Sequence, residues 1–274
     1  MNLQDIISKT IKDNNKPIGF DVFMNLALYH SEFGYYRSNK TLFGRHGDFI
    51  TAPETSDLFG YTLARQCKQV LNNGDILEFG AGSGVLAAQV LFELGKLSSL
   101  PGKYYIIELS AQLKDRQMQT IKKVLPEIFN RVEWLTELPK DFKGVVIANE
   151  VLDAMAVDIF KAKNDKFIQQ GVIINNNNSL KLSDMVENDK RFQFEVEKVL
   201  ANKPSFIDGY TSELNTWIRP WIKSLRDNLE QAVVFLCDYG YHRDLYYLPE
   251  RKKGTLACYH NHQVNYDPFI NIGS

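Results

Sequence analysis

Three acidic residues stand where they could act on a positively charged ligand. Glu78 lies near the end of the apolar run 76–79, just before the glycine-rich stretch GAGSG. Glu150 and Asp153 follow the apolar run VVIA at 145–148. A carboxylate can bind a guanidinium through two hydrogen bonds and can accept a proton as the nitrogen reacts. We therefore expect Glu150 and Asp153 to be catalytic, acting on a cationic or amine-like acceptor.

The GAGSG stretch itself predicts a turn that holds a nucleotide-like ligand. An apolar run precedes it and apolar residues at helical spacing follow it over 85–91. This strand–turn–helix order opens a nucleotide-binding α/β sheet. Glycines let the backbone approach a ligand that a Cβ atom would push away. The residues expected to contact the cofactor here are Glu78, Gly80, Ala81, Gly82 and Gly84.

The choice of ligand depends on the glycine spacing and on Glu78. Dinucleotide sites have G-x-G-x-x-G, whereas the third glycine of this chain comes one residue early. The Glu78 carboxylate would repel a pyrophosphate, but it could hold the ammonium of an amino-acid moiety, directly or through water. This combination favours S-adenosylmethionine, with an NAD-dependent dehydrogenase as the rival interpretation. A turn that only closes a strand–helix unit is the structural alternative.

Another acidic residue, Glu108, directly follows the next apolar run, at 104–107. Glu108 would accept hydrogen bonds from both ribose hydroxyls of an adenosine. Leu109 and Ser110 would line the adenine as cofactor contacts, and Ser110 would also cap the following helix. Because Glu108 would serve NAD equally well, it does not separate the two cofactors.

The elements that position these residues alternate between apolar strands and amphipathic helices. Strands near 76–79, 104–108, 131–135, 144–149 and 232–237 predict a parallel sheet. The fold class is therefore α/β and Rossmann-like. In an open sheet of this class, ligands bind beyond the carboxyl ends of the strands.

Five polar residues follow the last two of these strands. Asn149, Glu150 and Asp153 come after the fourth strand, and Asp238 and Tyr239 come after the fifth. We expect Asn149 to contact the cofactor and Tyr239 to stack on a cation. If the first turn continues into a helix, Glu150 and Asp153 share one face. The structural alternatives are capping by Asn149 and Asp153 and a core position for Tyr239.

The chain divides into three parts on the same pattern. Residues 1–70 form an N-terminal helical and loop extension, while 71–160 and 230–274 form the cofactor-binding core. Residues 161–229 are an inserted, largely helical substrate-side segment. It begins with a hairpin at 167–182, whose turn consists of four asparagines. We expect this insertion to pack over the cofactor side of the sheet.

Composition excludes several other classes of protein. A net charge of -1 over 274 residues gives no electrostatic footprint for nucleic acid, and no run is long enough to span a membrane. The dispersed Cys67, Cys237 and Cys258 are typical of reduced thiols. His260 and His262 alternate with Cys258, but a closed zinc site needs a fourth ligand, so we expect no metal.

Taken together, these motifs resemble the MidA family of class I methyltransferases, whose mitochondrial members help to assemble respiratory complex I. The resemblance spans nearly the whole chain. Its matching stretches are IGFDVFMNLALYHSEFGYY (18–36), FGRHGDFITAPETSDLFG (43–60), ILEFGAGSGVLA (76–87), YYIIELS (104–110), VVIANEVLDAMAV (145–157), DYGY (238–241) and GTLACYHNH (254–262).

The resemblance implies S-adenosylmethionine as the cofactor and extends the expected site. By composition alone, the polar segment 45–54 would be a solvated loop; by resemblance, it lies against the cofactor and the acceptor. Mitochondrial relatives methylate an arginine of a complex I core subunit, which agrees with an acidic acceptor site. The added cofactor contacts are Gly47, Asp48 and Thr51, and the expected acceptor contacts are Tyr36, Glu54, Asp238 and Tyr239.

The expected activity is therefore methylation of an arginine in a protein substrate, such as a complex I subunit. Methylation of another protein side chain or of a small amine is one alternative, and a cofactor-binding assembly chaperone with little turnover is another. Family members continue for about a hundred residues beyond 267–268, enough for two more strands at usual element lengths. We therefore expect the last strands to be missing here, and the uncovered edge would favour a homodimer. The N-terminus resembles no transit peptide, which predicts a bacterial cytoplasmic protein.

Overall fold

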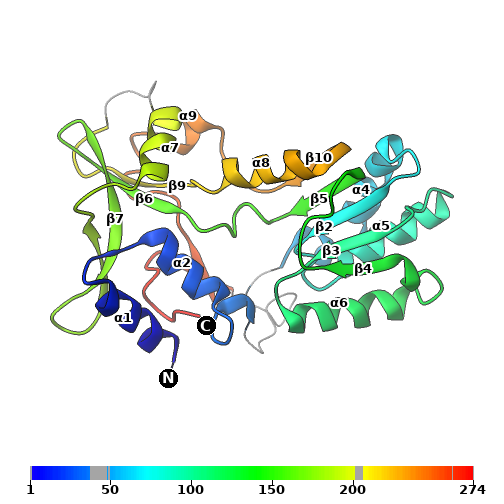
Figure 1. Ribbon diagram of the computed structural model, residues 1–274, viewed down its shortest axis with the longest axis horizontal. Helices are drawn as coiled ribbons and strands as arrows, with labels where there is room; N and C mark the ends of the chain where they lie inside the picture. The colour runs from blue at the N-terminus through cyan, green and yellow to red at the C-terminus, as the bar shows by residue number, and fades with distance from the viewer. Residues whose placement is uncertain (1, 38–47, 49, 201–205, 261, 274) are drawn as a thin grey trace. The chain divides into compact units, whose positions relative to one another are not determined.

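The computed structural model describes residues 2–37, 48, 50–200, 206–260 and 262–273 of the chain (Figure 1). The chain divides into two compact units. Unit 1 comprises Met1–Ser38, Met155–Pro220 and Gly240–Ser274, and unit 2 comprises Asn39–Ala154 and Trp221–Tyr239. Each unit has a sheet and buried apolar clusters of its own.

A parallel sheet of five strands forms the centre of unit 2. Its order is β10 (Leu229–Cys237), β5 (Phe142–Asn149), β2 (Asp75–Phe79), β3 (Tyr104–Ile107) and β4 (Val132–Leu135). The predicted Rossmann-like sheet is confirmed, with strand ends within a few residues of those expected. Short apolar runs form these strands because both faces of a parallel sheet are covered.

Helices α4 (Asp57–Val70), α5 (Val85–Lys96) and α6 (Ala111–Val124) cover one face of this sheet. Their apolar stripes meet the strands in one buried cluster that includes Ile76. Two shorter helices belong to the same unit: α3 (Ala52–Thr55) and the 3-10 helix η2 (Phe129–Arg131). On the opposite face, Leu77 and Val146 belong to a second cluster. Trp221, from helix α8 (Ile218–Asn228), packs edge-on against Phe79 with ring centroids 5.3 Å apart.

An antiparallel sheet forms the centre of unit 1. Its order is β1 (Ile18–Gly19), β7 (Lys166–Ile174), β6 (Asp158–Lys163) and β9 (Thr211–Leu214), and β8 (Leu180–Asp184) pairs with β7. The predicted asparagine turn is confirmed, since it joins β7 to β8. The strands over 158–163 and 211–214 were not predicted, so the inserted segment is not largely helical.

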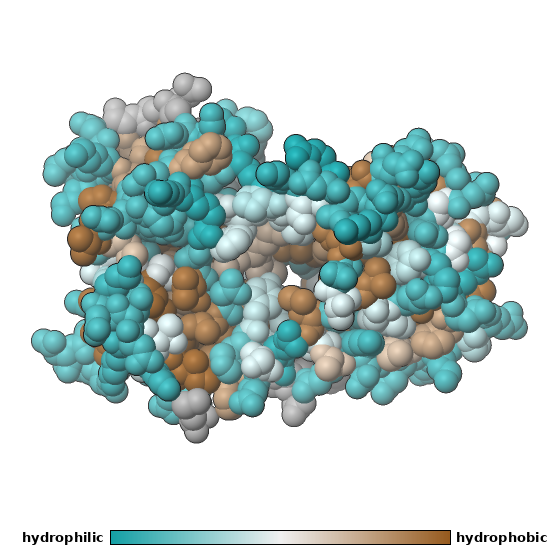
Figure 2. Space-filling model, in the orientation of Figure 1, coloured by the Kyte–Doolittle hydropathy of each residue, from teal (hydrophilic) through white to brown (hydrophobic). Residues whose placement is uncertain are grey.

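The helices of unit 1 pack on its sheet in two clusters. The first contains the apolar faces of α1 (Leu3–Asn14) and α2 (Phe20–Tyr29). The partly buried Met24 and Leu26 of α2 pack against this cluster. Figure 2 shows a group of apolar side chains in this part of unit 1. The second contains α7 (Lys190–Leu200). The remaining elements are η1 (Tyr35–Arg37), α9 (Arg243–Tyr246) and the hairpin of β11 (Cys258–His260) and β12 (Gln263–Asn265).

The two units differ from the three parts expected from the sequence. The expected extension 1–70 is divided, because α1 and α2 bury their apolar faces on the antiparallel sheet, whereas α4 packs on the parallel one. The segment after strand β10 was expected in the cofactor-binding core, but Gly240–Ser274 belongs to unit 1. Within the described residues, the parallel sheet has no strand beyond β10. No described helix has both the length and the apolar character needed to cross a lipid bilayer.

Candidate cofactor and acceptor site

The glycine turn between β2 and α5 has the backbone conformation that its sequence predicts. Gly80, Gly82 and Gly84 have φ values of 59°, 52° and 84°, in the left-handed region that glycine adopts readily. A Cβ atom on Gly84 would lie 2.9 Å from the Cα of Gln117, so close packing also requires glycine there. A Cβ atom on Gly80 would meet only a methyl group of Val151, at 3.8 Å. A Cβ atom would therefore fit at Gly80 without a clash, and it is the positive φ that favours glycine there.

Glu78 is enclosed by the core beneath this turn. Glu78 is 1% exposed, and its Oε2 accepts a hydrogen bond of 2.8 Å from the Tyr104 hydroxyl. Burial raises the pKa of Glu78 to about 7, the charge of Glu108 raises it further, and the Tyr104 bond opposes both. The predicted contact of Glu78 with a cofactor ammonium stays a prediction.

Glu108, the acid expected to bind the ribose, is held by two donors. The backbone N–H of Ser110 donates to one carboxyl oxygen and Nε2 of Gln117 donates to the other, both at 2.8 Å. Ser110 caps helix α6 as predicted, since its Oγ accepts from the N–H of Leu113 at 3.4 Å. The neighbouring Leu109 is 58% exposed, which leaves its side chain available to a ligand.

Gln117 is a site residue that the sequence did not reveal. Besides Glu108, its Nε2 donates to the carbonyl oxygen of Gly82 at 3.1 Å, and its Oε1 accepts from Nε1 of Trp134 at 2.8 Å. It therefore ties the ribose acid to the glycine turn. One signal was present: Gln117 stands at helical spacing between the buried Leu113 and Ile121, where an apolar residue would be expected.

The segment around α3 is attached to the same turn. The Ser83 hydroxyl, inside the turn, donates to Oε1 of Glu54. Nε2 of Gln89, in helix α5, donates to the Pro53 carbonyl at 2.9 Å. Of the other predicted cofactor contacts, Thr51 occupies the N-cap position of α3 and Asp48 is buried. Gly47 lies outside the described residues.

The predicted catalytic acids meet at the carboxyl ends of β5 and β10. Asp238 organises this turn, because its Oδ2 accepts from the N–H groups of Leu152 (2.8 Å) and Asp153 (3.1 Å). The N–H of Glu150 donates to the Cys237 carbonyl at 2.8 Å. Glu150 has a φ of 52°, and no helix begins there. Glu150 and Asp153 therefore do not share a helix face, as the sequence suggested. The hydrogen bonds of Asp238 hold the turn that carries both of them.

The electrostatics of this acid cluster, Glu150, Asp153 and Asp238, leave it short of positive charge. Partial burial and the charges of Asp238 and Glu150 raise the pKa of Asp153 to about 6. Partial burial also raises the pKa of Glu150, although the Tyr239 hydroxyl and the N–H of Ala52 donate to its carboxylate. Among the described residues, none of the three acids forms an ion pair with lysine or arginine. A bound cation would relieve their mutual repulsion.

The structure brings most, but not all, of the predicted residues together in unit 2. Asn149 ends β5 beside Glu150, and Tyr239, which is 69% exposed, follows Asp238. Tyr36 belongs to unit 1 instead, where its ring stacks on Tyr29 with centroids 5.5 Å apart. Its predicted contact with the acceptor stays a prediction.

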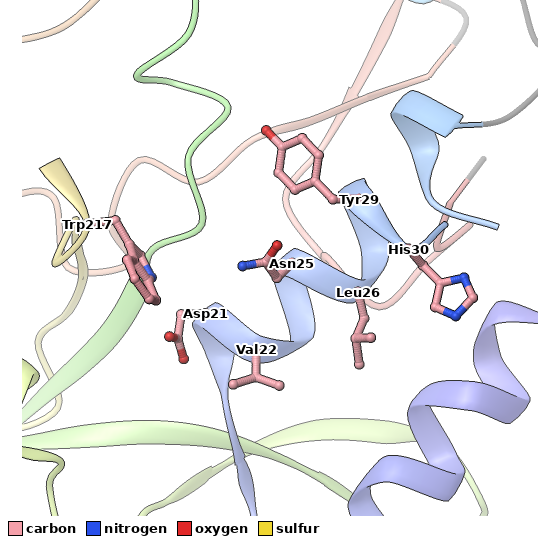
Figure 3. Close-up of a pocket in the computed structure, with 7 residues that line it drawn as sticks. All are labelled: Asp21, Val22, Asn25, Leu26, Tyr29, His30 and Trp217. Atoms are coloured by element: carbon pink, nitrogen blue, oxygen red, sulfur yellow. The ribbon is translucent and has the colours of Figure 1, made fainter. Parts of the chain in front are cut away.

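Unit 1 has a pocket of about 320 Å³ on one side of α2 (Figure 3). Asp21 at one end pairs with Arg191 at 2.6 Å, and the Arg191 guanidinium lies 3.9 Å from the ring centre of Trp217. None of the predicted site residues lines this pocket. Its lining residues are Asp21, Val22, Asn25, Leu26, Tyr29, His30 and Trp217. Elsewhere in the described part of the chain, no cluster of three or more histidine, cysteine or acidic side chains could hold a metal ion.

Comparison with known proteins identifies relatives of the whole arrangement. Residues 58–274 match the family described as "putative S-adenosyl-L-methionine-dependent methyltransferase". A COG1565 superfamily member from Burkholderia thailandensis, crystallised with S-adenosyl-homocysteine, superimposes with a TM-score of 0.91 at 33% identity. The match covers 99% of this chain and 70% of that one.

Two animal proteins named as protein arginine methyltransferases are also similar. The NDUFAF7 homolog of Drosophila melanogaster is 24% identical over 94% of this chain, which spans 63% of its length. The NDUFAF7 protein of Danio rerio is 26% identical over 58% of this chain, which spans 43% of its length. Both names carry the word mitochondrial. This chain thus spans less than two thirds of the length of these two curated relatives.

Proposed function

This chain belongs to the family of S-adenosyl-L-methionine-dependent methyltransferases, and we propose that it methylates a guanidinium nitrogen of an arginine in a protein substrate. The observation that carries the choice of acceptor is the acid cluster. Its three acids lie close enough for the charges of Asp238 and Glu150 to raise the pKa of Asp153, and none of them forms an ion pair with a described lysine or arginine. A guanidinium supplies the planar positive charge that such a cluster binds best.

The residues around the glycine turn fit the cofactor. Because the glycines of the turn have no Cβ, the cofactor can approach the backbone closely, and Glu108, fixed by Gln117, presents oxygens to ribose hydroxyls. When bound, S-adenosylmethionine supplies a methyl group on a positively charged sulfur, ready for attack by a nitrogen.

The acids would then act on the acceptor. Glu150 and Asp153 bind and orient the guanidinium, so that one nitrogen faces the methyl carbon. As the nitrogen–carbon bond forms and the carbon–sulfur bond breaks, the nitrogen loses one proton, and a carboxylate accepts it. Asp153, with a pKa of about 6, is suited to this role, because a general base works best with a pKa near the operating pH.

The relatives support the arginine proposal through their names, and the resemblance suggests a core subunit of respiratory complex I as the acceptor. A decisive experiment has two stages. Calorimetric titration with S-adenosylhomocysteine and with NAD should give micromolar binding of the former alone. Mass spectrometry should then find methylarginine in a complex I core subunit incubated with the enzyme and S-adenosylmethionine. Methyl transfer that persists after the arginine is replaced by lysine would contradict an arginine acceptor.

A further inference from the structure

Two carboxyl groups lie at the glycine turn, and their surroundings differ. The sequence predicted that Glu78 holds the ammonium of the cofactor and that Glu54 contacts the acceptor. Glu78, however, is 1% exposed, and its Oε2 is occupied by the Tyr104 hydroxyl. A carboxyl group this enclosed leaves little surface on which an ammonium could keep its remaining hydrogen bonds.

Glu54 has the access that Glu78 lacks. It is half-buried, and its Oε1 accepts from the hydroxyl of Ser83, the residue between Gly82 and Gly84. No described residue donates a hydrogen bond to its second oxygen. The Ser83 bond therefore brings a carboxylate with a spare acceptor oxygen to the glycine turn.

The chain fixes Glu54 through its neighbours. Nε2 of Gln89 donates to the Pro53 carbonyl and to Oδ1 of Asp57, each at 2.9 Å, so the residues on both sides of Glu54 are attached to helix α5. Gly60 makes this approach possible, because a Cβ there would lie 2.4 Å from the Cβ of Gln89. A group held in this way can bind a ligand without first being ordered.

We propose that Glu54, rather than Glu78, binds the ammonium of the methionine portion of the cofactor and of its product. This inference rests on the proposed function, since it needs a cofactor with an amino-acid end. The ammonium donates to the free oxygen of Glu54, while Ser83 keeps the other oxygen at the turn. Glu78 is then a positioning residue, which acts through Tyr104 within the core.

The test compares two ligands that differ in the ammonium. S-adenosylhomocysteine has the amino-acid end, whereas 5′-methylthioadenosine keeps the adenosine and the thioether but lacks it. A glutamine oxygen can still accept from Ser83, so Glu54→Gln should leave the turn intact. We expect it to weaken S-adenosylhomocysteine binding by about 10- to 100-fold, the range for a charge-assisted hydrogen bond, and to leave methylthioadenosine unchanged.

Three further variants make the result specific. Glu54→Ala should show the same selective loss, which keeps the test valid if the glutamine variant folds poorly. Glu78→Gln should leave the ratio of the two affinities unchanged, because its effect passes through the core. Glu127→Gln, an exposed acid of the same unit, should change neither affinity.

The outcomes distinguish this inference from the function on which it rests. If Glu78→Gln changes the ratio and Glu54→Gln does not, the inference is wrong and the prediction from the sequence is right. If the unsubstituted protein binds S-adenosylhomocysteine but neither Glu54 variant alters the ratio, only the inference fails. If the unsubstituted protein binds neither ligand, the proposed function fails and this inference falls with it.

Discussion

Both units contain carboxyl groups close to one another, but their surroundings differ: the buried acids of unit 1 have a cationic partner, whereas the acid cluster of unit 2 has none among the described residues. In unit 1, Asp21 lies 2.6 Å and Asp158 lies 4.0 Å from the Arg191 guanidinium. Asp158 also accepts from Thr216 and Gln169, each at 2.7 Å. In unit 2, the acids accept from backbone N–H groups and a tyrosine hydroxyl, and the nearest charges that act on them are those of other acids.

The difference shows in which of the two regions the described residues themselves balance the negative charge. Burial raises the pKa of Asp158 in unit 1 to about 6, the same value that Asp153 has in unit 2. A raised pKa therefore does not distinguish a structural acid from a functional one. The charged groups that surround each acid do distinguish them. Arg191 supplies the positive charge in unit 1, whereas the described residues supply none to the acid cluster. We expect the first region to stabilise the fold and the second to act on a ligand.

The largest effect should come from Glu150→Gln, which removes a charge from the acid cluster. The loss of a group that binds and deprotonates the acceptor should lower kcat by about 10²- to 10⁴-fold. Affinity for S-adenosylhomocysteine should change little, and so should stability. Methyl transfer by Glu150→Gln and by the exposed control Glu137→Gln would be followed on the same acceptor. Full activity of Glu150→Gln would contradict a role of the acid cluster in methyl transfer.

The next effect should come from Arg191→Met in unit 1. Without the guanidinium, Asp21 and Asp158 are left as buried acids without a cation, which should lower the free energy of unfolding by about 3 kcal/mol. Urea unfolding measures this change. Arg226→Met, which breaks an exposed pair with Asp227, should cost under about 0.5 kcal/mol. Equal effects of the two substitutions would show that the Arg191 network does not support the fold.

A smaller effect should follow from Thr216→Val, within the same network. The Thr216 hydroxyl donates to Asp158 at 2.7 Å and accepts from Nε of Arg191 at 2.9 Å, and the residue is fully buried. Its loss should lower the free energy of unfolding by about 1–2 kcal/mol, because both partners lose a hydrogen bond. Thr216→Ser, which keeps the hydroxyl, should recover most of this stability in the same urea experiment. If serine and valine behave alike, the hydroxyl is not the cause.

The smallest effect, and one of opposite sign, should come from Asp153→Asn. The pKa of Asp153 is raised from 3.8 to about 6 in the folded protein, so folding favours its protonated form. The stability that Asp153 contributes is therefore present below pH 3.8 and lost as the pH rises through about 6. Although packing partly desolvates the Asp153 carboxyl, much of the residue remains in contact with solvent, so screening should limit the gain in the asparagine variant at pH 7.5 to under about 1 kcal/mol.

Urea midpoints measured from pH 3.5 to 7.5 would test the sign of this effect. The midpoints of Asp153→Asn and the unsubstituted protein should agree at the acidic end and separate above pH 5. Asp115→Asn, an exposed acid on α6, serves as the control. A variant that is less stable at neutral pH would mean that the Asp153 charge has a favourable partner.

The sequence by itself determined the parallel sheet, the glycine turn and the strand ends at which the acids lie. Short apolar runs predicted the strands of unit 2, which are four to nine residues long, and Ser110 marked the start of α6. Such signals can be read from the sequence because they depend on neighbouring residues alone. Strands β1, β6 and β9 of unit 1 escaped prediction. The two edge strands among them, β1 and β9, have only two and four residues and show almost no period.

Only the tertiary structure decided which side chains meet. Glu54 and Ser83 are 29 residues apart, and Asp238 is 86 residues from the Leu152 N–H that it accepts from. No local pattern records such pairs, because they exist only once helices and strands have packed. The same packing buried Glu78 against the Tyr104 hydroxyl and placed Arg191 beside Asp21 and Asp158. It also left one Glu54 oxygen without a hydrogen-bond donor among the described residues. The sequence thus identified the candidate acids, whereas the fold decided which of them have a hydrogen-bond or ion-pair partner among the described residues.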